Sequence, residues 1–213
     1  MKNKPPKALL LFSGGLDSLL AGEILRRNNV QITWLTFTTP FFSAEKSVSA
    51  ARLYNFPLII APLPEKAYID VLINPPHGFG KHMNPCIDCH ALMLKVAGQM
   101  MEERGYDFLA TGEVLGERPK SQTSTALKMV DAASGYADYI LRPLSAKLLP
   151  ATAPEREGLV NRENLLPISG RSRKEQIELA KKWLITTYPS PGGGCPLTEK
   201  FFSLKLRRLM EAF

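Results

Sequence analysis

The residues with the clearest chemical potential form a short glycine-containing turn near the beginning of the chain. This glycine turn comprises residues 13–18, Ser-Gly-Gly-Leu-Asp-Ser, and follows an apolar run at residues 8–11. A helical pattern of apolar residues comes next, so we expect a buried strand that leads through the turn into a helix. The first N–H groups of a helix lack partners within the helix and attract phosphate. The turn therefore predicts a phosphate-binding site.

Each polar residue of the glycine turn can contribute to such a site. Gly14 and Gly15 let the backbone approach an anion, and the hydroxyl groups of Ser13 and Ser18 add hydrogen-bond donors. Asp17 can bind Mg²⁺ directly or through a water molecule. The turn lacks the Gly-Lys-Ser/Thr of a Walker A loop and the Gly-x-Gly-x-x-Gly of dinucleotide-binding folds. The pattern predicts that the protein uses a nucleoside triphosphate through a different kind of loop.

Three cysteines form the second set of residues with chemical potential. Cys86 and Cys89 have Cys-x-x-Cys spacing at the beginning of a predicted helix, and Cys195 follows a glycine-rich loop. The helix dipole favours thiolate, so we expect lowered pKa values for the first two thiols. Four interpretations are open. The cysteines bind three irons of a [4Fe–4S] cluster, or Cys195 carries a persulfide that is resolved through a disulfide. Alternatively, they bind zinc with His82 or His90, or they are unrelated buried thiols.

The glycine turn resembles the Ser-Gly-Gly-x-Asp-Ser loop of the N-type ATP pyrophosphatases, also called the PP-loop superfamily. Its combination with Cys-x-x-Cys and one later cysteine resembles the tRNA thiolation enzymes of that superfamily. Residues 84–89 are similar to a stretch of the wobble-uridine thiolases, and residues 121–123, Ser-Gln-Thr, are similar to a segment of the four-thiouridine synthases. Residues 188–200 resemble the region of the latter enzymes that carries a catalytic cysteine.

The resemblance implies an ATP-dependent tRNA sulfurtransferase, with Asp17 and Cys195 as candidate catalytic residues. Such an enzyme cleaves ATP between the α- and β-phosphates and transfers AMP to a carbonyl oxygen of a uridine or cytidine. Sulfur, from sulfide or a persulfide carrier protein, then replaces AMP through a [4Fe–4S] cluster or a persulfide. We expect the RNA-binding, β-barrel and rhodanese domains of the resembling enzymes to be absent from these 213 residues. We therefore expect a homodimer or a separate RNA-binding chain to help bind tRNA.

Further residues complete the predicted nucleotide site. We expect ATP at the carboxyl ends of the strands, where open α/β sheets bind ligands. The backbone near Thr36 and Phe37 ends the second predicted strand and is expected to contact adenine, and Gly112 ends the fourth strand. Positive charge is needed where phosphate charge develops during the reaction. Arg142 and Lys174 are the candidate cations, and Lys174 resembles a lysine that precedes the catalytic cysteine of the four-thiouridine synthases.

Alternating strand-like and helix-like segments predict an α/β fold, a Rossmann-like open parallel sheet of about five strands with helices on both faces. Apolar runs predict strands at residues 8–11, 30–38, 58–60, 108–111 and 139–141. Helical periodicity predicts helices at residues 18–27, 43–54, 88–104, from 172 onward and 201–213. Ser172 and Glu175 have the spacing of a capping box. Residues 74–86 are rich in Pro, Gly and His and are expected to form a long functional loop.

The composition indicates a globular protein with a basic surface. The chain has 213 residues, with 27 Lys and Arg against 20 Asp and Glu, and a net charge of +7. From residue 147 onward there are 12 Lys and Arg and 7 Asp and Glu, so this part carries +5 of that charge. A basic surface favours a polyanion such as RNA. We expect one PP-loop domain over residues 1–213, with a basic helical segment at about 172–213.

Other features of the sequence concern location and alternative functions. No apolar run approaches the length of a membrane span, and the first residues lead directly into the first strand without room for a signal peptide. We therefore expect a cytoplasmic protein with no membrane partner. The three histidines and two tryptophans are expected to be loop, cap or packing residues. Two other functions are open: a PP-loop ligase or sulfur-inserting enzyme for a small molecule, and a non-catalytic module that binds a nucleotide or a cluster.

Overall fold

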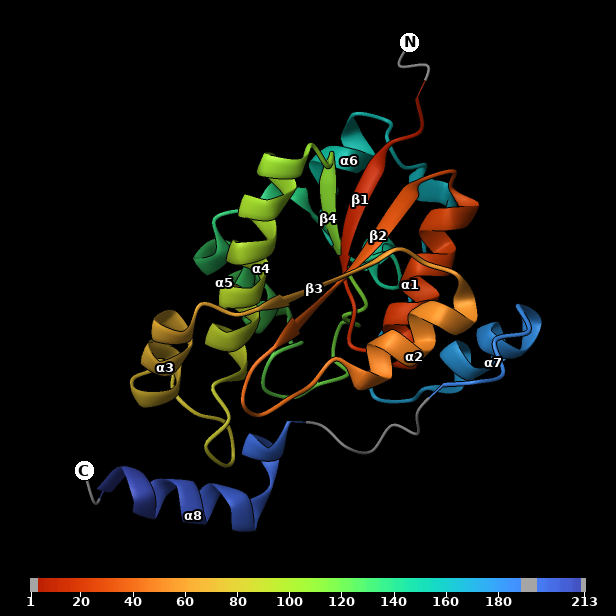
Figure 1. Ribbon diagram of the computed structural model, residues 1–213. Coiled ribbons are helices and arrows are strands. Elements are labelled where there is room, and N and C mark those ends of the chain that lie inside the picture. The colour runs from red at the N-terminus through yellow and green to blue at the C-terminus, as the bar shows by residue number, and fades with distance from the viewer. Residues whose placement is uncertain (1–3, 189–194, 212–213) are drawn as a thin grey trace.

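The strands of the computed structural model form one parallel sheet, drawn in Figure 1. The structure describes residues 4–188 and 195–211. The strands are β1 (Lys7–Leu11), β2 (Gln31–Thr38), β3 (Leu58–Pro62), β4 (Phe108–Thr111) and β5 (Ile140–Leu141). They lie in the order β3-β2-β1-β4-β5, and every pairing is parallel. This arrangement confirms the predicted Rossmann-like open sheet of five strands.

The strand order puts β1 at the centre of the sheet, between β2 and β4. The chain proceeds from β1 to β2 and β3 on one side and later places β4 and β5 on the other side. The connections therefore diverge at the carboxyl ends of β1 and β4, where open sheets of this kind bind their ligands. The glycine turn follows β1 directly, so the topology positions it at this point.

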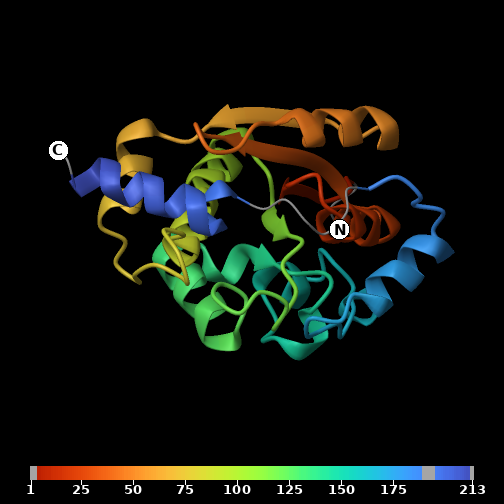
Figure 2. The same cartoon turned by 90° about the horizontal axis from the view of Figure 1, so that it is seen from below.

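Helices cover both faces of the sheet, as the sequence predicts (Figures 1 and 2). One face is covered by α1, α2 and α7, and the other by α3, α4 and α5. The helices are α1 (Leu16–Arg27), α2 (Glu45–Tyr54), α3 (Glu65–Ile73), α4 (Cys86–Arg104), α5 (Ser124–Ser134), α6 (Ala153–Arg156), α7 (Lys174–Lys182) and α8 (Lys200–Glu211). Short 3₁₀ turns are η1 (Ala137–Tyr139), η2 (Ala146–Leu148), η3 (Arg162–Asn164) and η4 (Pro196–Thr198).

Two hydrophobic clusters fill the space between the sheet and its helices. Successive strand residues point to opposite faces. Leu10 and Trp34 accordingly belong to the cluster under α1, whereas Leu9 and Leu35 belong to the cluster under α4. All four side chains are at most 1% exposed. Burial on both faces explains why the strands read as continuous apolar runs in the sequence.

The predicted helices lie within a few residues of observed ones, but α3, α5 and the four-residue α6 were not predicted. In α3, Ile69 and Ile73 are 43% and 59% exposed, so the helix has no continuous buried stripe that periodicity could reveal. In α5, Ala126, Leu127 and Val130 are buried, and the helix packs closely against α4. These two helices depend on neighbouring elements more than on their own pattern.

The capping box predicted at Ser172 and Glu175 is wrong. Helix α7 begins at Lys174 with Arg173 as its N-cap residue, and no side chain caps it. Because Arg173 occupies the cap position, its backbone leaves the helix there and its side chain is free to reach another element. A capping box does occur at α6, where Thr152 and Glu155 satisfy each other's backbone groups.

The C-terminal helix α8 lies at the carboxyl edge of the sheet. The hydroxyl of Ser203 donates to the Leu197 carbonyl at 3.0 Å and accepts from the Met83 N–H at 3.3 Å. The ring of Phe202 meets Phe41 edge-on at 5.8 Å between centroids. Figure 2 shows α8 beside α3. Residues 189–194, where the sequence suggests a glycine-rich loop, lie outside the described residues.

Within the described ranges, no helix is both long enough and apolar enough to span a membrane.

Candidate nucleotide and thiol site

The glycine turn crosses from β1 into α1 in a conformation suited to an anion. Gly14 has a φ of +76°, in the left-handed region that favours glycine. Gly15 is the N-cap residue of α1 and has no side chain to occupy the first N–H groups of the helix. The Ser18 hydroxyl donates to the Gly15 carbonyl at 2.9 Å and lies 3.4 Å from the Ser13 hydroxyl. The residues predicted to bind phosphate therefore lie together at one helix end.

Gly112 brings the end of β4 against the glycine turn. A Cβ atom at Gly112 would lie 2.5 Å from the backbone nitrogen of Ser18 and 2.6 Å from its Cα. Since both are backbone atoms of a helix, neither can move aside cheaply. Gly14 faces a similar limit, because a Cβ there would lie 2.9 Å from the Cβ of Lys46. Close packing explains these two glycines, and the nucleotide contact of Gly112 stays a prediction.

Thr36 and Phe37 lie near the carboxyl end of β2, beside the glycine turn. The Thr36 hydroxyl donates to the Phe12 carbonyl at 2.7 Å, and both side chains are at most 5% exposed. The side chains of Thr36 and Phe37 therefore pack within the core. A contact with adenine would come from the backbone at this end of the strand, which stays a prediction.

Asp17, the predicted magnesium ligand, contacts a basic residue from a distant part of the sequence. The guanidinium of Arg173 donates from Nη2 to Asp17 Oδ2 at 3.2 Å. The other carboxylate oxygen of Asp17 is buried and has no hydrogen-bond partner among the described residues. Burial raises the pKa of Asp17 more than Arg173 and Arg118 lower it. One oxygen of the Asp17 carboxylate is therefore left without a partner from the described residues.

Two further polar side chains surround Arg173. Glu117 Oε1 lies 3.9 Å from Arg173 Nε, and the Gln176 amide donates to Glu117 Oε2 at 3.5 Å. Gln176 is completely buried. Burial and then the Asp17 carboxylate raise the pKa of Glu117, while Arg173 and Arg118 oppose them. Two carboxylates thus share one guanidinium at the beginning of α1.

Lys174 follows Arg173 in the sequence, but its side chain does not take the place of the Arg173 guanidinium at Asp17. It is the first residue of α7, and its side chain is exposed. Arg173, which the motifs do not indicate, is the basic residue that contacts Asp17. The predicted role of Lys174 at the phosphates stays a prediction.

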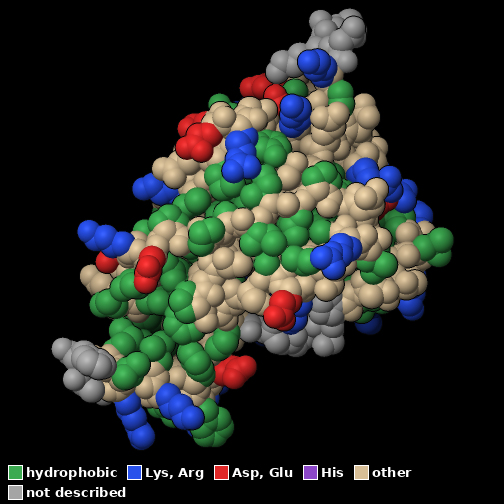
Figure 3. Space-filling view, in the orientation of Figure 1, with side chains coloured by type: hydrophobic (Ala, Val, Ile, Leu, Met, Phe, Trp, Pro, Cys, Tyr) green, Lys and Arg blue, Asp and Glu red, His purple; other side chains and the backbone are tan. Residues whose placement is uncertain are grey.

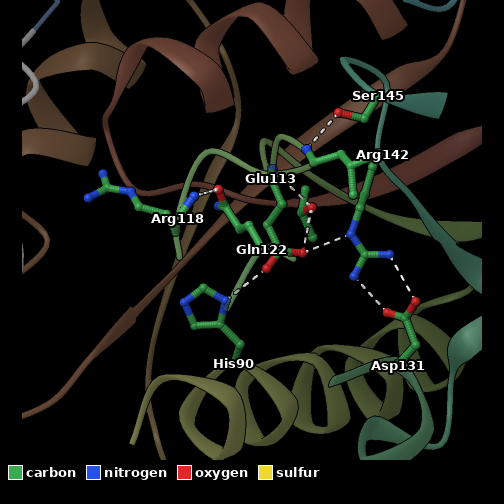
Figure 4. Close-up of polar contacts among 9 residues, drawn as sticks. His90, Glu113, Arg118, Gln122, Asp131, Arg142 and Ser145 are labelled. Carbon is green, nitrogen blue, oxygen red and sulfur yellow. Dashed lines mark hydrogen bonds and ion pairs between the residues drawn. The ribbon is translucent and has the colours of Figure 1, made fainter. Parts of the chain in front are cut away.

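Glu113, the residue after Gly112, is the centre of a buried polar network (Figure 4). His90 Nδ1 lies 2.8 Å from Glu113 Oε1. Arg142 Nε donates to Glu113 Oε2 at 3.0 Å, and its terminal nitrogens donate to the Asp131 carboxylate at 3.0 and 2.6 Å. The Thr111 hydroxyl also donates to Glu113 Oε2, at 3.2 Å. The network joins α4, α5 and the carboxyl ends of β4 and β5.

Electrostatics in this network keep Glu113 ionised. Burial raises the pKa of Glu113, but Arg142 and His90 outweigh it and lower the pKa to about 2. Burial is also the largest influence on Asp131 and leaves the pKa of that carboxyl raised despite Arg142. Arg142 is 4% exposed, and its guanidinium is engaged by both carboxylates. These contacts give Arg142 a positioning role through Glu113, and its direct action on phosphate stays a prediction.

His90 differs from the loop or cap role expected of the histidines. It lies on the second turn of α4, and its side chain is 31% exposed. Figure 4 shows the ring nitrogen that does not contact Glu113 directed away from the network. The network therefore orients an accessible imidazole one residue from Cys89.

The three cysteines lie in one neighbourhood although they are distant in the sequence. Cys86 and Cys89 are in the first turn of α4, and Cys195 precedes η4. None of the three forms a disulfide, and the Asn84 amide donates to Cys86 Sγ at 3.2 Å. Burial, and then the nearby Cys195 and Cys86 thiols, raise the pKa of Cys89 to about 12. The lowered pKa expected from the helix dipole is therefore wrong for Cys89, because burial outweighs the dipole.

The metal interpretations of the cysteines find only partial support. Three thiols in one neighbourhood suit iron or zinc chemically. However, across residues 4–188 and 195–211 no group of three or more His, Cys, Asp and Glu side chains is arranged to hold a metal ion. Binding of a [4Fe–4S] cluster or zinc by Cys86, Cys89 and Cys195 stays a prediction.

The Ser-Gln-Thr segment holds the loop that carries Glu117. The Gln122 side chain accepts from the Arg118 N–H at 3.1 Å, and its backbone carbonyl accepts from the Gly116 N–H at 2.6 Å. Ser121 and Gln122 are both buried. This segment therefore positions the loop at the end of β4.

Four residues of the site were not singled out from the sequence, Glu113, Glu117, Arg173 and Gln176, and His90 was considered only as a zinc ligand or a loop or cap residue. The two glutamates follow a predicted strand at its carboxyl end, which is a usable signal for a ligand-binding edge. His90 follows the Cys-x-x-Cys pair directly. Arg173 and Gln176 carry no local signal, because their partners lie far away in the sequence.

Comparisons with known proteins agree with this geometry. Residues 5–147 match the family model described as "Thiamine biosynthesis protein (ThiI)". A "Probable tRNA sulfurtransferase" of Lysinibacillus sphaericus (strain C3-41) is 32% identical over 147 residues, 65% of this chain and 34% of the relative. A "tRNA-specific 2-thiouridylase MnmA 1" of Syntrophus aciditrophicus (strain SB) is 27% identical over 202 residues, 87% of this chain and 50% of the relative. The chain thus spans about a third to a half of these relatives.

Among solved structures, a similar fold occurs in "Crystal structure of a 4-thiouridine synthetase - RNA complex with bound ATP". The two chains superpose with a TM-score of 0.53 and 21% sequence identity. The match covers 82% of this chain and 50% of the other. At this identity the likeness concerns the fold.

Proposed function

This chain belongs to the ThiI family, and from that premise we propose that it is an ATP-dependent tRNA sulfurtransferase. It activates a carbonyl oxygen of a tRNA uridine or cytidine with ATP and replaces that oxygen with sulfur. Pyrophosphate and AMP leave in successive steps. The sulfur comes from sulfide or from a persulfide carrier protein.

The observation that carries this function is a short path of contacts between the glycine turn and the thiols. Gly112 touches the backbone of Ser18 in the glycine turn. Glu113, the next residue, contacts His90, which follows Cys89 in α4. The residues proposed for activation by ATP and those proposed for sulfur transfer lie at the same edge of the sheet, and this supports a reaction in two consecutive steps.

In the first step, residues of the glycine turn hold the phosphates of ATP. Backbone N–H groups at the start of α1 and the hydroxyls of Ser13 and Ser18 bind phosphate oxygens. Asp17 lies where it can hold the Mg²⁺ that accompanies ATP. The base carbonyl oxygen attacks the α-phosphate, and pyrophosphate leaves. Lys174 is the candidate for neutralising the charge that develops.

In the second step, sulfur replaces the adenylated oxygen. A persulfide on Cys195 attacks the activated carbon, and AMP leaves. The thiolate of Cys86 or Cys89 then attacks the Cys195 sulfur, which forms a disulfide and releases the thiocarbonyl. A cellular dithiol reductant then reduces this disulfide, and the persulfide carrier protein transfers its outer sulfur to the Cys195 thiolate. A [4Fe–4S] cluster on the same three thiols is the alternative carrier of sulfide.

Other parts of the proposed function concern the domain organisation, tRNA binding and the location of the reaction. Residues 1–213 act as one PP-loop domain, and the basic segment from about residue 172 contributes to tRNA binding. A homodimer or a separate RNA-binding chain adds the remaining contacts. The reaction takes place in the cytoplasm, where tRNA is available.

Sulfur transfer to tRNA tests this function directly. Protein purified without oxygen is incubated with bulk tRNA, Mg²⁺, ATP and a dithiol reductant, and the sulfur source is a persulfide carrier protein in one reaction and sulfide in a parallel one. Pyrophosphate release is measured, and nucleosides from digested tRNA are identified by mass spectrometry. We expect Asp17→Ala to abolish pyrophosphate release, and Cys195→Ala to stop thionucleoside formation while pyrophosphate release persists. Glu178→Gln, an exposed change on α7, serves as the control and retains both activities.

Two results would contradict the proposed function. Pyrophosphate release without any dependence on tRNA would indicate an enzyme for a small molecule. Absence of pyrophosphate release with every tRNA preparation would indicate a nucleotide-binding module. Iron content separates the sulfur carriers: about four irons per chain supports a [4Fe–4S] cluster, whereas colourless protein with full activity supports the Cys195 persulfide.

A further inference from the structure

A small pocket lies where α1 and α7 end, away from the glycine turn. Its volume is about 290 Å³, near the lower limit of ligand pockets, so it suits a single planar group. Its walls come from the ends of α1 and α7 and from η3 and the segment after it. We call it the Arg27 pocket, and its lining residues are Ile24, Arg27, Asn28, Asn164, Leu166 and Trp183.

The guanidinium of Arg27 is held in place on one side of the Arg27 pocket. Its central carbon lies 4.6 Å from the centroid of the Trp183 ring. Arg27 Nε donates to Glu23 Oε1 at 2.7 Å, so the side chain is anchored at two points. The Arg27 side chain is 50% exposed, and its terminal nitrogens form no hydrogen bond with the described residues. Nucleobases stack on guanidinium planes as well as on aromatic rings, so this group is a preformed stacking surface.

Two asparagine amides form the polar part of the Arg27 pocket. Asn164 Nδ2 donates to Asn28 Oδ1 at 3.1 Å, and the Asn28 amide donates to the Ile24 carbonyl at 2.9 Å. Asn164 is exposed, and its Oδ1 accepts no hydrogen bond from the described residues. An amide with a free acceptor and a second N–H can pair with the edge of a base, as asparagine does with adenine.

The surroundings of the Arg27 pocket carry positive charge. Arg26 and Arg27 both contact the carboxylate of Glu23, so two positive charges share one negative charge. Residues 181–182, both lysines, are exposed in the last turn of α7 and precede Trp183 directly in the sequence. The basic rim therefore favours phosphate groups, whereas the interior offers stacking and amide contacts.

We propose that the Arg27 pocket binds one unstacked nucleobase of an RNA strand. The base stacks on the Arg27 guanidinium, its edge pairs with the Asn164 amide, and the adjoining phosphates lie on the basic rim. Helix α7 packs against α1 and contacts it at both ends, at Asp17 and at Arg27. With 12 residues, α1 separates the pocket from the glycine turn by about 18 Å. The pocket is therefore a second contact for the strand, remote from the reaction.

That the strand is tRNA rests on the proposed function, but binding of a base requires neither ATP nor sulfur transfer. Fluorescence titration of the full chain with a single-stranded adenylate hexamer tests the inference. Of the two tryptophans, Trp34 is 0% exposed in the core, so quenching on binding reports on Trp183. An abasic hexamer of equal length and free AMP are the comparison ligands. Each lacks part of the contacts, so we expect both to bind about tenfold more weakly than the adenylate hexamer.

Two single variants remove the contacts of the base. Arg27→Gln removes the stacking surface, and Asn164→Ala removes the exposed amide. Each should weaken binding of the adenylate hexamer about tenfold. Arg52→Gln and Gln99→Ala, exposed changes on α2 and α4, are the matched controls for a lost charge and a lost amide. Both controls should leave the affinity unchanged.

Several results would overturn the inference. They are wild-type affinity for the adenylate hexamer in both variants, an equal loss in the matched controls, or equal affinity for the abasic hexamer. AMP that binds as tightly as the hexamer would overturn the assignment to RNA and identify a free nucleotide as the occupant. Asn164→Ala changes one exposed side chain, so it decides the question if Arg27→Gln does not fold. Absence of tRNA thiolation with the expected hexamer results would contradict the proposed function alone.

Discussion

At the residue scale, Glu113 links the parts of the candidate site. It follows Gly112, which touches the glycine turn, and it contacts His90, which follows Cys89. Arg142 engages Glu113 and Asp131 together and keeps the Glu113 carboxylate ionised within the core. Removal of one member of a buried charge network leaves its partner unpaired, and this is costly. The network therefore orients His90 and also stabilises the fold.

Glu113→Gln should destabilise the protein by about 3 kcal/mol at pH 7, because Arg142 loses a buried partner. Since the pKa of Glu113 is lowered from 4.5 to about 2, its contribution is present above pH 4.5 and is lost as the pH falls toward 2. The difference between wild type and variant should therefore shrink between these values. Urea unfolding at pH 7 and pH 3 measures it.

Glu103→Gln is the control for this experiment, because Glu103 is exposed on the same helix as His90. An exposed substitution of this kind should change stability by about 0.5 kcal/mol or less. A difference between Glu113→Gln and wild type that stays constant from pH 7 to pH 3 would contradict the assignment of the lowered pKa to Glu113.

At the element scale, α7 is the helix that completes the candidate site, and it ends under strain. Leu184 follows the C-cap with a φ of +57°, and its side chain is 82% exposed. The Ile185 N–H donates to the Ala180 carbonyl, and the Leu184 N–H to the Lys181 carbonyl, which is the pattern of a Schellman motif. Glycine usually occupies the left-handed position of this motif, and α4 ends on Gly105 at φ +68°.

Leu184→Gly should stabilise the protein by about 0.5 to 1 kcal/mol, because glycine adopts this conformation without strain and little packing is lost. Leu184→Ala removes the same exposed side chain and keeps the strain, so it should leave stability near that of wild type. Thermal unfolding of the three proteins measures both effects. Equal stability of the glycine and alanine variants would mean that backbone strain at residue 184 is negligible.

At the scale of the whole molecule, Lys and Arg side chains are spread over the surface, and one group of them lies at the end that carries α8. Figure 3 shows Lys and Arg side chains projecting there beside hydrophobic ones. Lys200, Lys205, Arg207 and Arg208 are exposed on α8, and Phe201 is 78% exposed. Basic side chains around an exposed aromatic ring suit a nucleic acid, whose phosphates and bases they can contact. The same helix contacts the loop that precedes Cys86, through Met83 and Ser203.

Affinity for tRNA should therefore fall with rising salt concentration, because phosphate contacts release counterions. The double variant Lys205→Gln/Arg208→Gln should lower the slope of log K against log salt by about two, or one per removed contact. Lys128→Gln/Arg52→Gln removes two exposed positive charges from α5 and α2 and serves as the matched control. Filter binding over a salt series measures the slopes. Equal slopes for the two double variants would exclude α8 from the RNA interface.

Much of the fold was predictable because its signals are local. The apolar run of β1, the two glycines and the helical pattern of α1 follow one another directly in the sequence. Together they indicate a strand, a turn and a helix. The same is true of β4 and of the helix that begins at the Cys-x-x-Cys pair. Helix α3 was missed because it leaves Ile69 and Ile73 exposed, so its pattern lacks a clear face.

The sequence by itself determined the glycine turn between a strand and a helix, the five strands in their order along the chain and the Cys-x-x-Cys pair, because each depends on residues within a few positions of one another. Only the tertiary structure decided that Arg173 contacts Asp17, that Arg142 forms a buried ion pair with Glu113, and that burial raises the pKa of Cys89. Those outcomes depend on which distant groups share a poorly solvated space. Solvation and long-range pairing are properties of the packed molecule, and no local pattern encodes them.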